Sequence, residues 1–421
     1  MKTENFRTIG FAMVKNEVDI IEPFVRHNMQ FLDALIVFDH YSSDGTREVL
    51  LKLSREYNSV AVCTYDRDAH DQGELLTKQL AKFQQKFRAD LAIFLDADEF
   101  IRFDDGIDFA SCARDLSPGG VGLIPWRTYI PDPDAPMTLA EPLDRFTLRR
   151  SREMPTYYKV LVRLNGATDS QFCITQGSHT VRTQSGKAIA TKMLNGVHLM
   201  HFPVRSIAQL VAKSKIGSLT NSLRSDTRSK TQAYQWQRVA DMERNGEIGE
   251  GNRFLFEEAM IYAQSSHDGN LHDNIEASGH GIAVVRRYSD GQRQSPEELY
   301  QAEVRRLQSR EPPKRYWSIK RLFQSKTDDE SDDLPSIRYL VRKYGQAGLF
   351  FDPDFGGLSG FSTASANGCA VHVRLVDEPP SDAFREVHFD TLVAQSLSFS
   401  KTLRHQLCVF ARAQGTAEVP V

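Results

Sequence analysis

The sequence predicts an α/β protein whose helices sandwich a mostly parallel β-sheet. Two observations support this prediction. First, short apolar runs alternate through the first hundred residues with longer segments whose apolar residues recur at helical spacing. Second, each run is apolar throughout, as expected of a strand that is buried on both faces, and such strands are typical of parallel sheets. A strand–helix alternation that ends on a fourth strand favours a sheet covered by helices on both faces.

The elements follow in order from the N-terminus. The run "TIGFAMV" predicts a first strand at 8–14, and the segment after it predicts a helix at 19–32. Asp19 and Glu22 have the spacing of a capping box, which is a common start of a helix. The same reasoning predicts strands at 34–39, 60–65 and 91–95, and helices at 46–57 and 73–87.

After residue 100 the pattern is less regular. Strands are expected at 121–130 and 157–164, with a proline-rich loop between them. A further helix is expected after Ser206, which has capping-box spacing to Gln209, and helical character continues from there. The predicted organisation is an α/β domain at 1–265, a helical or linker segment at 266–335, and a C-terminal region at 336–421 whose fold and role the sequence does not indicate.

The composition is that of an ordinary globular protein. The formal charge of −3 and the isoelectric point near 6.5 argue against a protein that binds nucleic acid mainly through charge. No apolar run approaches the roughly 20 residues that cross a bilayer. Five scattered cysteines suit reduced thiols. We therefore expect a cytoplasmic protein without a transmembrane segment, either free or peripheral to a membrane, and the sequence does not indicate its oligomeric state.

Carboxylates follow each of the first four predicted strands. In an open parallel sheet, ligands bind beyond the carboxyl ends of the strands. A site whose ligands are all oxygen atoms favours magnesium or manganese, and these ions also bridge the oxygens of a diphosphate. The sequence therefore predicts an acidic crevice for a metal–diphosphate complex in a Rossmann-like, nucleotide-binding half. The residues in question are Glu17, Asp39, Asp66, Asp68, Asp96, Asp98 and Glu99.

Several motifs follow one another in a characteristic order: "KNE", "DHYSSDGT", "DADEF", "GSHTV" and "HFPVRS". In this the chain resembles the family-2-like glycosyltransferases of the GT-A fold. It is most similar to the subgroup related to family 92, which carries NE, DxSxDGT, DxDEF and HfxxRS motifs. The resemblance covers about residues 8–220, and it implies a GT-A type of α/β fold.

The resemblance also implies a role for individual residues. It implies Mn²⁺ or Mg²⁺ as cofactor, a UDP- or GDP-sugar as donor, and a glycan or another hydroxyl compound as acceptor. The residues that it places at the nucleotide or diphosphate are Asn16, Glu17, Asp39, Asp44, Asp96, Arg205 and Lys213. The residues that it places at the metal are Asp96, Asp98, His179 and His201, and His198 is an alternative to His201.

The expected function is metal-dependent transfer of a sugar from a nucleotide-diphosphate sugar to an acceptor hydroxyl. The sequence does not single out a catalytic base. The loop after Trp126 departs from the family pattern and would lie near the acceptor. Its Asp132 and Asp134 are candidates, and Glu153 is a third. Two alternatives stay open: a nucleotidyltransferase or phosphatase that uses the acidic pair, and a non-catalytic nucleotide-binding protein.

Overall fold

The structure is a computed structural model. It describes residues 6–65, 71–87, 89–136, 141–164, 172–222, 234–264, 274–289 and 294–309, and the strands at 317–318, 349–351, 369–375, 385–387 and 407–413. The chain divides into two compact units, Met1–Phe323 and Gln324–Val421. The division at residues 265 and 335 stays a prediction, and most of the segment expected to be a linker lies outside the described residues.

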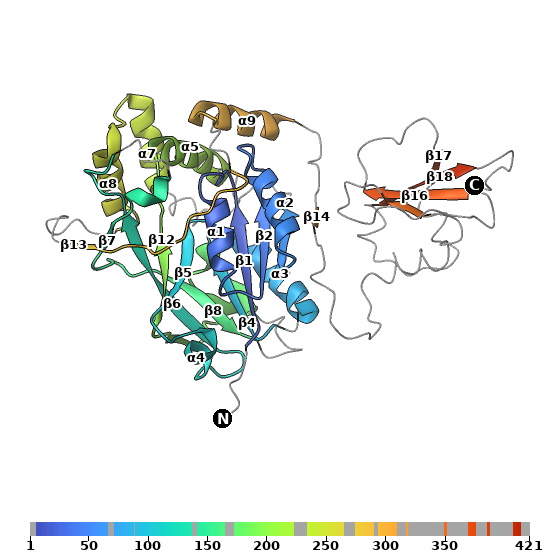
Figure 1. Cartoon of the computed structure of the whole chain (residues 1–421), viewed down its shortest axis with the longest axis horizontal. Helices are drawn as coiled ribbons and strands as arrows, with labels where there is room; N and C mark the ends of the chain where they lie inside the picture. The colour runs from blue at the N-terminus through green and yellow to red at the C-terminus, as the bar shows by residue number, and fades with distance from the viewer. Residues whose placement is uncertain are drawn as a thin grey trace. The chain divides into compact units, whose positions relative to one another are not determined.

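The first unit begins with four strands and three helices in strict alternation (Figure 1). Strands β1, β2, β3 and β4 are parallel neighbours in the order β3-β2-β1-β4, which is the order of a Rossmann-like half. The elements are β1 (Thr8–Val14), α1 (Ile21–Asn28), β2 (Ala34–Asp39), α2 (Thr46–Glu56), β3 (Val60–Thr64), α3 (Gln72–Phe87) and β4 (Leu91–Leu95).

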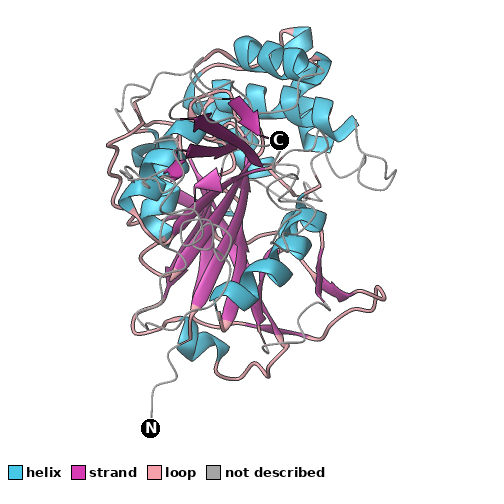
Figure 2. Ribbon diagram, turned by 90° about the vertical axis from the view of Figure 1, so that its right-hand side faces the viewer, coloured by secondary structure: helices cyan, strands magenta, loops and turns pink. Residues whose placement is uncertain are grey.

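The two faces of this sheet lie in different cores, as the period of two along a strand requires. Leu35 and Val37 of β2 pack in one core with residues of α1 and α2, whereas Ile36 and Phe38 pack in the other with residues of α3. Figure 2 shows helices on either side of the central strands and a further group above them. The α/β class, with a mostly parallel sheet sandwiched by helices, is therefore confirmed.

The sheet continues beyond β4 with antiparallel pairings. Strand β8 lies between β4 and β6 and is antiparallel to both, and this arrangement agrees with the GT-A type that the sequence predicts. The further strands are β5 (Glu99–Phe103), β6 (Val121–Ile130), β7 (Leu148–Arg150), β8 (Tyr158–Arg163), β11 (Thr191–Met193), β12 (Val197–His201), β13 (Ile275–Ala277) and β14 (Trp317–Ser318). A small separate sheet pairs β9 (Phe172–Ile174) with β10 (Val181–Thr183).

A group of helices follows β12 and extends the first unit, as Figure 1 shows at the top of the sheet. The longest, α5, packs against α7 and α9. The remaining helices are α4 (Phe109–Ala113), α5 (Ile207–Ser222), α7 (Tyr234–Asn245), α8 (Gly251–Ile261), α9 (Pro296–Gln308), and the 3-10 turns η1 (Pro142–Arg145) and η3 (Gln176–Ser178).

The predicted capping box of α1 is wrong. Helix α1 begins at Ile21 after an N-cap without a side-chain hydrogen bond. Asp19 instead accepts hydrogen bonds from Arg205. The Glu22 carboxylate accepts from the backbone N–H groups of residues 287–289, a segment far away in the sequence. Both carboxylates are almost fully shielded from water, so each needs protein hydrogen-bond donors. Residues distant in the sequence supply these donors, and the local capping box does not form.

The second unit contains a four-stranded sheet in the order β15-β16-β18-β17. Its strands are β15 (Leu349–Phe351), β16 (Cys369–Leu375), β17 (Arg385–Val387) and β18 (Leu407–Ala413).

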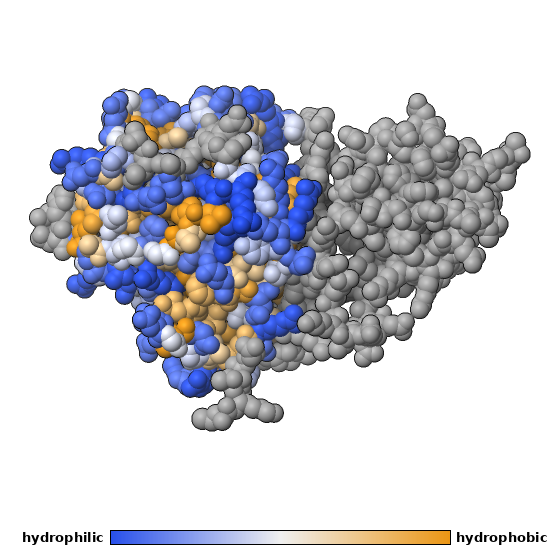
Figure 3. Space-filling model, viewed as in Figure 1, coloured by the Kyte–Doolittle hydropathy of each residue, from blue (hydrophilic) through white to orange (hydrophobic). Residues whose placement is uncertain are grey.

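The surface of the first unit is mixed. Polar residues dominate the face seen in Figure 3, and apolar patches lie among them. Among the described residues, the large hydrophobic side chains with the highest exposure are Met154, Met193 and Val285. No helix within the described part of the chain is long and apolar enough to span a bilayer.

Candidate active site

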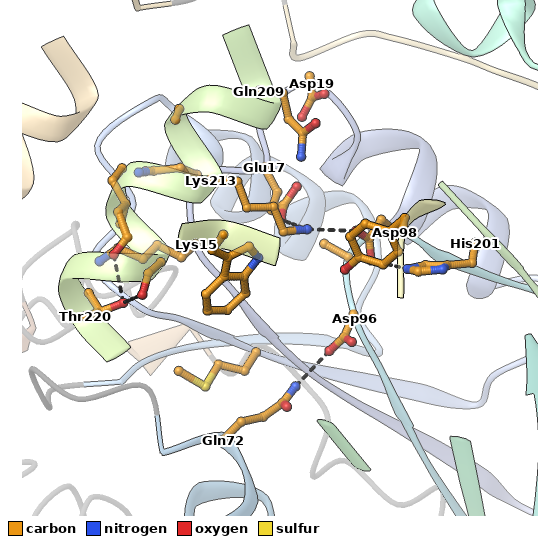
Figure 4. Close-up of a pocket in the computed structure, with 18 of the residues that line it drawn as sticks. Lys15, Glu17, Asp19, Gln72, Asp96, Asp98, His201, Gln209, Lys213 and Thr220 are labelled. Atoms are coloured by element: carbon orange, nitrogen blue, oxygen red, sulfur yellow. Dashed lines mark hydrogen bonds and ion pairs between the residues drawn. The ribbon is translucent and has the colours of Figure 1, made fainter. Parts of the chain in front are cut away.

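A cavity of about 490 Å³ opens where the carboxyl ends of β1 and β4 meet helix α5. Residues that directly follow β1 line it together with the acidic pair that follows β4 (Figure 4). This is the position at which parallel α/β sheets bind their ligands. Of the residues predicted from the sequence, the cavity is lined by Asn16, Glu17, Asp44, Asp96, Asp98, His179, His201 and Lys213.

The turn after β4 explains how the distant parts of the site meet. The chain reverses at Asp96–Ala97–Asp98 and runs back as β5, which pairs with β12. In this register His201 lies opposite Glu99, next to Asp98. The end of β12 then leads directly into α5, two turns of which bring Lys213 over the same carboxylate.

Asp98 is 2% exposed and lies between a cation and an imidazole (Figure 4). Its Oδ2 accepts a hydrogen bond from the Lys213 ammonium at 2.8 Å. Its Oδ1 faces Nε2 of His201 at 3.8 Å, which is too long for a hydrogen bond. Burial raises the pKa of Asp98, but the nearby cations lower it further, so the pKa lies well below its usual range and the group is ionised.

Asp96 has both carboxylate oxygens occupied by protein donors. Oδ2 accepts from the buried Lys159 at 2.6 Å, and Oδ1 accepts from the Gln72 amide at 2.8 Å. The same Lys159 ammonium lies 3.3 Å from Glu99. Burial raises the pKa of Glu99 to about 8, so this carboxyl group is mostly protonated at neutral pH. Asp96 is thus fixed by the protein, and Asp98 keeps one oxygen directed at His201.

His201 is neutral at physiological pH, because burial lowers its pKa to about 3. Its ring stacks on the indole of Trp126, with 4.3 Å between the centroids. Within the described residues, its buried Nδ1 has no hydrogen-bond partner. A neutral imidazole nitrogen and a carboxylate oxygen that face each other are two ligand atoms suited to a divalent cation.

The two atoms are candidates to hold an ion. They face each other at 3.8 Å with no hydrogen bond between them, so both could bind one ion after a small side-chain movement. The described residues contain no group of three or more His, Cys, Asp or Glu side chains placed to hold a metal. Magnesium is commonly held by one or two carboxylates, while waters and substrate phosphates complete its coordination. Asp98 and His201 therefore fit a site that a diphosphate would complete.

His179 lies in the same cavity but in a different environment. Its Nδ1 donates a hydrogen bond to the carbonyl oxygen of Tyr158 at 2.8 Å. Its ring contacts Trp126 edge-on at 5.6 Å between centroids. Burial is the main cause that lowers the pKa of His179, so the ring is neutral. The structure does not group His179 with Asp98 and His201 among the described residues.

Arg205 is 1% exposed and does not line the cavity. Its guanidinium binds the carboxylates of Glu17 and Asp19, and its distance to Asp98 is 3.5 Å. Lys213 is 27% exposed, lines the cavity, and lies 3.5 Å from Glu17. Of the two cations that the sequence places near the diphosphate, the structure thus opens Lys213 to the cavity and buries Arg205.

The residues that follow β2 hold one another in place. Asp39 is fully buried, does not line the cavity, and forms an ion pair with Arg47 at 2.8 Å. Asp44 lines the cavity and accepts hydrogen bonds from the backbone N–H groups of Val18 and Thr46. Asn16 has a positive φ of 55° and accepts from the N–H of Ser43. Asp66 and Asp68 lie outside the described residues.

None of the three candidate bases, Asp132, Asp134 and Glu153, lines the cavity. Asp132 accepts hydrogen bonds from the backbone N–H of Asp134 and from Thr147 in the loop after β6. Glu153 is buried and binds Arg150 and the backbone N–H of Thr128. Its carboxylate thus joins neighbouring strands.

Several residues of the site were not predicted from the sequence. Lys159 has one local signal, because Lys159 and Arg163 are the charged residues of the strand predicted at 157–164. The amide and aromatic residues of the site have no signal in the sequence, because their spacing is that of ordinary surface or core residues. They are Gln72, Trp126, Tyr157, Gln176, Gln209, Trp236 and Tyr262.

His198 gives a prediction about acid stability. It lies on β12, outside the cavity, and burial among arginines lowers its pKa to about 4. The histidine pKa is near 6.5 in the unfolded chain, so between about pH 6.5 and about pH 4 the unfolded chain binds a proton at His198 and the folded chain does not. Stability therefore falls as the pH drops through this range. When the pH is lowered from about 7.5 to about 5, we expect the free energy of unfolding to fall by about 2 kcal/mol more in the native protein than in His198→Asn. Urea unfolding at both pH values measures this difference. Equal losses in both proteins would contradict the assignment.

Comparisons with known proteins complete the description of the site. No protein-family model matches the chain, and no curated protein matches it. Among solved structures, it is similar to a mannosyltransferase from Pyrobaculum calidifontis in complex with GDP-Man and Mn²⁺, at 12% identity and a TM-score of 0.29, over 64% of this chain and 79% of that one. It is also similar to mannosyl-3-phosphoglycerate synthase from Rubrobacter xylanophilus, at 13% identity and a TM-score of 0.26, over 58% and 76%. At these scores no property of either protein is transferred to this chain.

Proposed function

We propose that the protein is a metal-dependent glycosyltransferase that moves a sugar from a nucleotide-diphosphate sugar to an acceptor hydroxyl. The observation that supports this most directly is the facing pair of Asp98 Oδ1 and His201 Nε2, 3.8 Å apart in the cavity. The pair lies at the carboxyl end of a Rossmann-like half, where parallel α/β sheets bind their ligands, and next to Lys213, which lines the cavity and is 27% exposed.

The residues of the cavity have distinct tasks in this proposal. Asp98 and His201 hold the ion, and Asp96 stays fixed by Lys159 and Gln72 so that the turn keeps its shape. The bound ion supplies Lewis-acid stabilisation of the charge that develops on the departing diphosphate. Lys213 adds a positive charge on the same side of the cavity. Asn16 and Asp44 also line the cavity, and in this proposal they contact the nucleoside.

The test is to incubate the full chain with manganese and a panel of nucleotide sugars and to identify the phosphate product. We expect slow release of free nucleoside diphosphate with water as acceptor, and its loss when a chelator removes the metal. Release of pyrophosphate or inorganic phosphate would instead indicate a nucleotidyltransferase or phosphatase. Calorimetric nucleotide binding without any release would indicate a binding protein, and either result would overturn the proposal.

A further inference from the structure

Resting on the proposed function, we propose that His179 is the catalytic base that takes the proton from the acceptor hydroxyl. The first step of the argument is the state of its ring. A carbonyl oxygen can only accept, so the hydrogen bond to Tyr158 places the ring proton on Nδ1. Because the ring is neutral, Nε2 keeps its lone pair, and no described residue donates a hydrogen bond to it. This is the form of histidine that a general base requires.

The second step is the position of the ring. His179 lines the cavity together with Trp126 and Tyr157, and the three rings contact one another at 4.9–5.6 Å between centroids. These contacts and the hydrogen bond to Tyr158 fix the orientation of the imidazole. Gly177, also in the lining, has a φ of 74°, and a Cβ there would lie 2.6 Å from Nε2. A larger residue at position 177 would therefore collide with the Nε2 edge of the ring.

The third step compares the other groups of the cavity. Each carboxylate of the described lining already accepts hydrogen bonds or ion pairs from the protein; these carboxylates are Glu17, Asp19, Asp44, Asp96 and Asp98. Proton transfer to any of them would have to disturb a buried partner. His201 faces Asp98 across the place that the proposed function gives to the ion. Within the described lining, His179 is therefore the weak base whose ring is held in a fixed orientation and whose Nε2 can still accept a proton.

The reaction balances with these groups alone. The acceptor hydroxyl gives its proton to Nε2 of His179, and its oxygen forms a bond to the anomeric carbon. The bond from that carbon to the diphosphate oxygen breaks, and its electron pair leaves with the nucleoside diphosphate. Direct displacement of this kind inverts the anomeric configuration, so the inference also predicts the stereochemistry of the product.

The experiment uses His179→Asn in the full chain with manganese and the best nucleotide sugar of the panel. The asparagine amide retains an N–H that can bond to Tyr158, but it removes Nε2. With water as acceptor, we expect diphosphate release to fall by about 10²- to 10⁴-fold. Azide is an anionic nucleophile with no proton to lose, so adding it should restore release in this variant and yield an inverted glycosyl azide.

His198→Asn is the matched control, because His198 lies outside the cavity and the variant should release diphosphate at the native rate. Calorimetric binding of UDP and GDP by His179→Asn should also equal that of the native chain. Native release from His179→Asn would overturn the base assignment alone. Lost release without rescue by azide, or together with lost nucleotide binding, would assign His179 a structural role and overturn it too. If the native chain releases no diphosphate from any nucleotide sugar, the proposed function itself fails.

Discussion

Asp98→Asn is expected to reduce metal-dependent release of nucleoside diphosphate by at least about 10²-fold. Asparagine keeps the shape of the side chain and can still accept the hydrogen bond from Lys213. It loses the negative charge that faces His201, and with it the group that would hold the ion most directly. Release should be measured with a nucleotide sugar over a range of manganese concentrations.

Asp104→Asn is the matched control, because Asp104 is exposed at the end of β5 and outside the cavity. This variant should release diphosphate at the native rate. Direct titration of manganese in the presence of UDP or GDP should show weaker binding by Asp98→Asn alone. If Asp98→Asn kept both the native rate and the native dependence on manganese, Asp98 could not be a ligand of the metal.

The parallel half of the fold could be predicted because its signal is local. Strands β1, β2 and β4 coincide with the predicted ranges, since strands buried on both faces require continuous apolar runs. Strand β5 could not be predicted in this way. Its sequence "EFIRF" contains two ionisable residues, and it is a strand because β12, almost a hundred residues later, pairs with it. Such pairing leaves no trace in a local pattern.

The acidic edge of the sheet could also be predicted, because side chains that follow parallel strands must meet there. What the sequence could not supply is the partner of each charge. Lys159 reaches Asp96 from the antiparallel β8, and Arg205 reaches Asp19 from a position 186 residues later in the chain. Asp39 has a nearer partner, Arg47, eight residues later at the start of α2, and this pair was not predicted either. The pairing of buried charges, and not their presence, decides which carboxylates remain open to a ligand.

Arg205→Met is expected to lower the free energy of unfolding by about 3–5 kcal/mol. The guanidinium is 1% exposed, donates to Asp19 at 2.8 and 3.0 Å and to the carbonyl of Phe202 at 3.1 Å, and forms an ion pair with Glu17. Methionine matches the stem of the side chain but removes the guanidinium from both buried carboxylates, and the Lys213 ammonium lies 3.5 Å from Glu17. The loss should be measured by urea unfolding with an unchanged m-value.

Arg253→Met is the control for this substitution, because Arg253 is 82% exposed on α8 and its ion pair with Glu257 is weak. We expect it to change stability by less than about 0.5 kcal/mol. Arg205→Lys separates charge from geometry, since one ammonium cannot bond to two carboxylates in the manner of a planar guanidinium. It should recover only part of the loss. If Arg205→Met were as stable as Arg253→Met, the buried ion pairs of Arg205 would not support the fold.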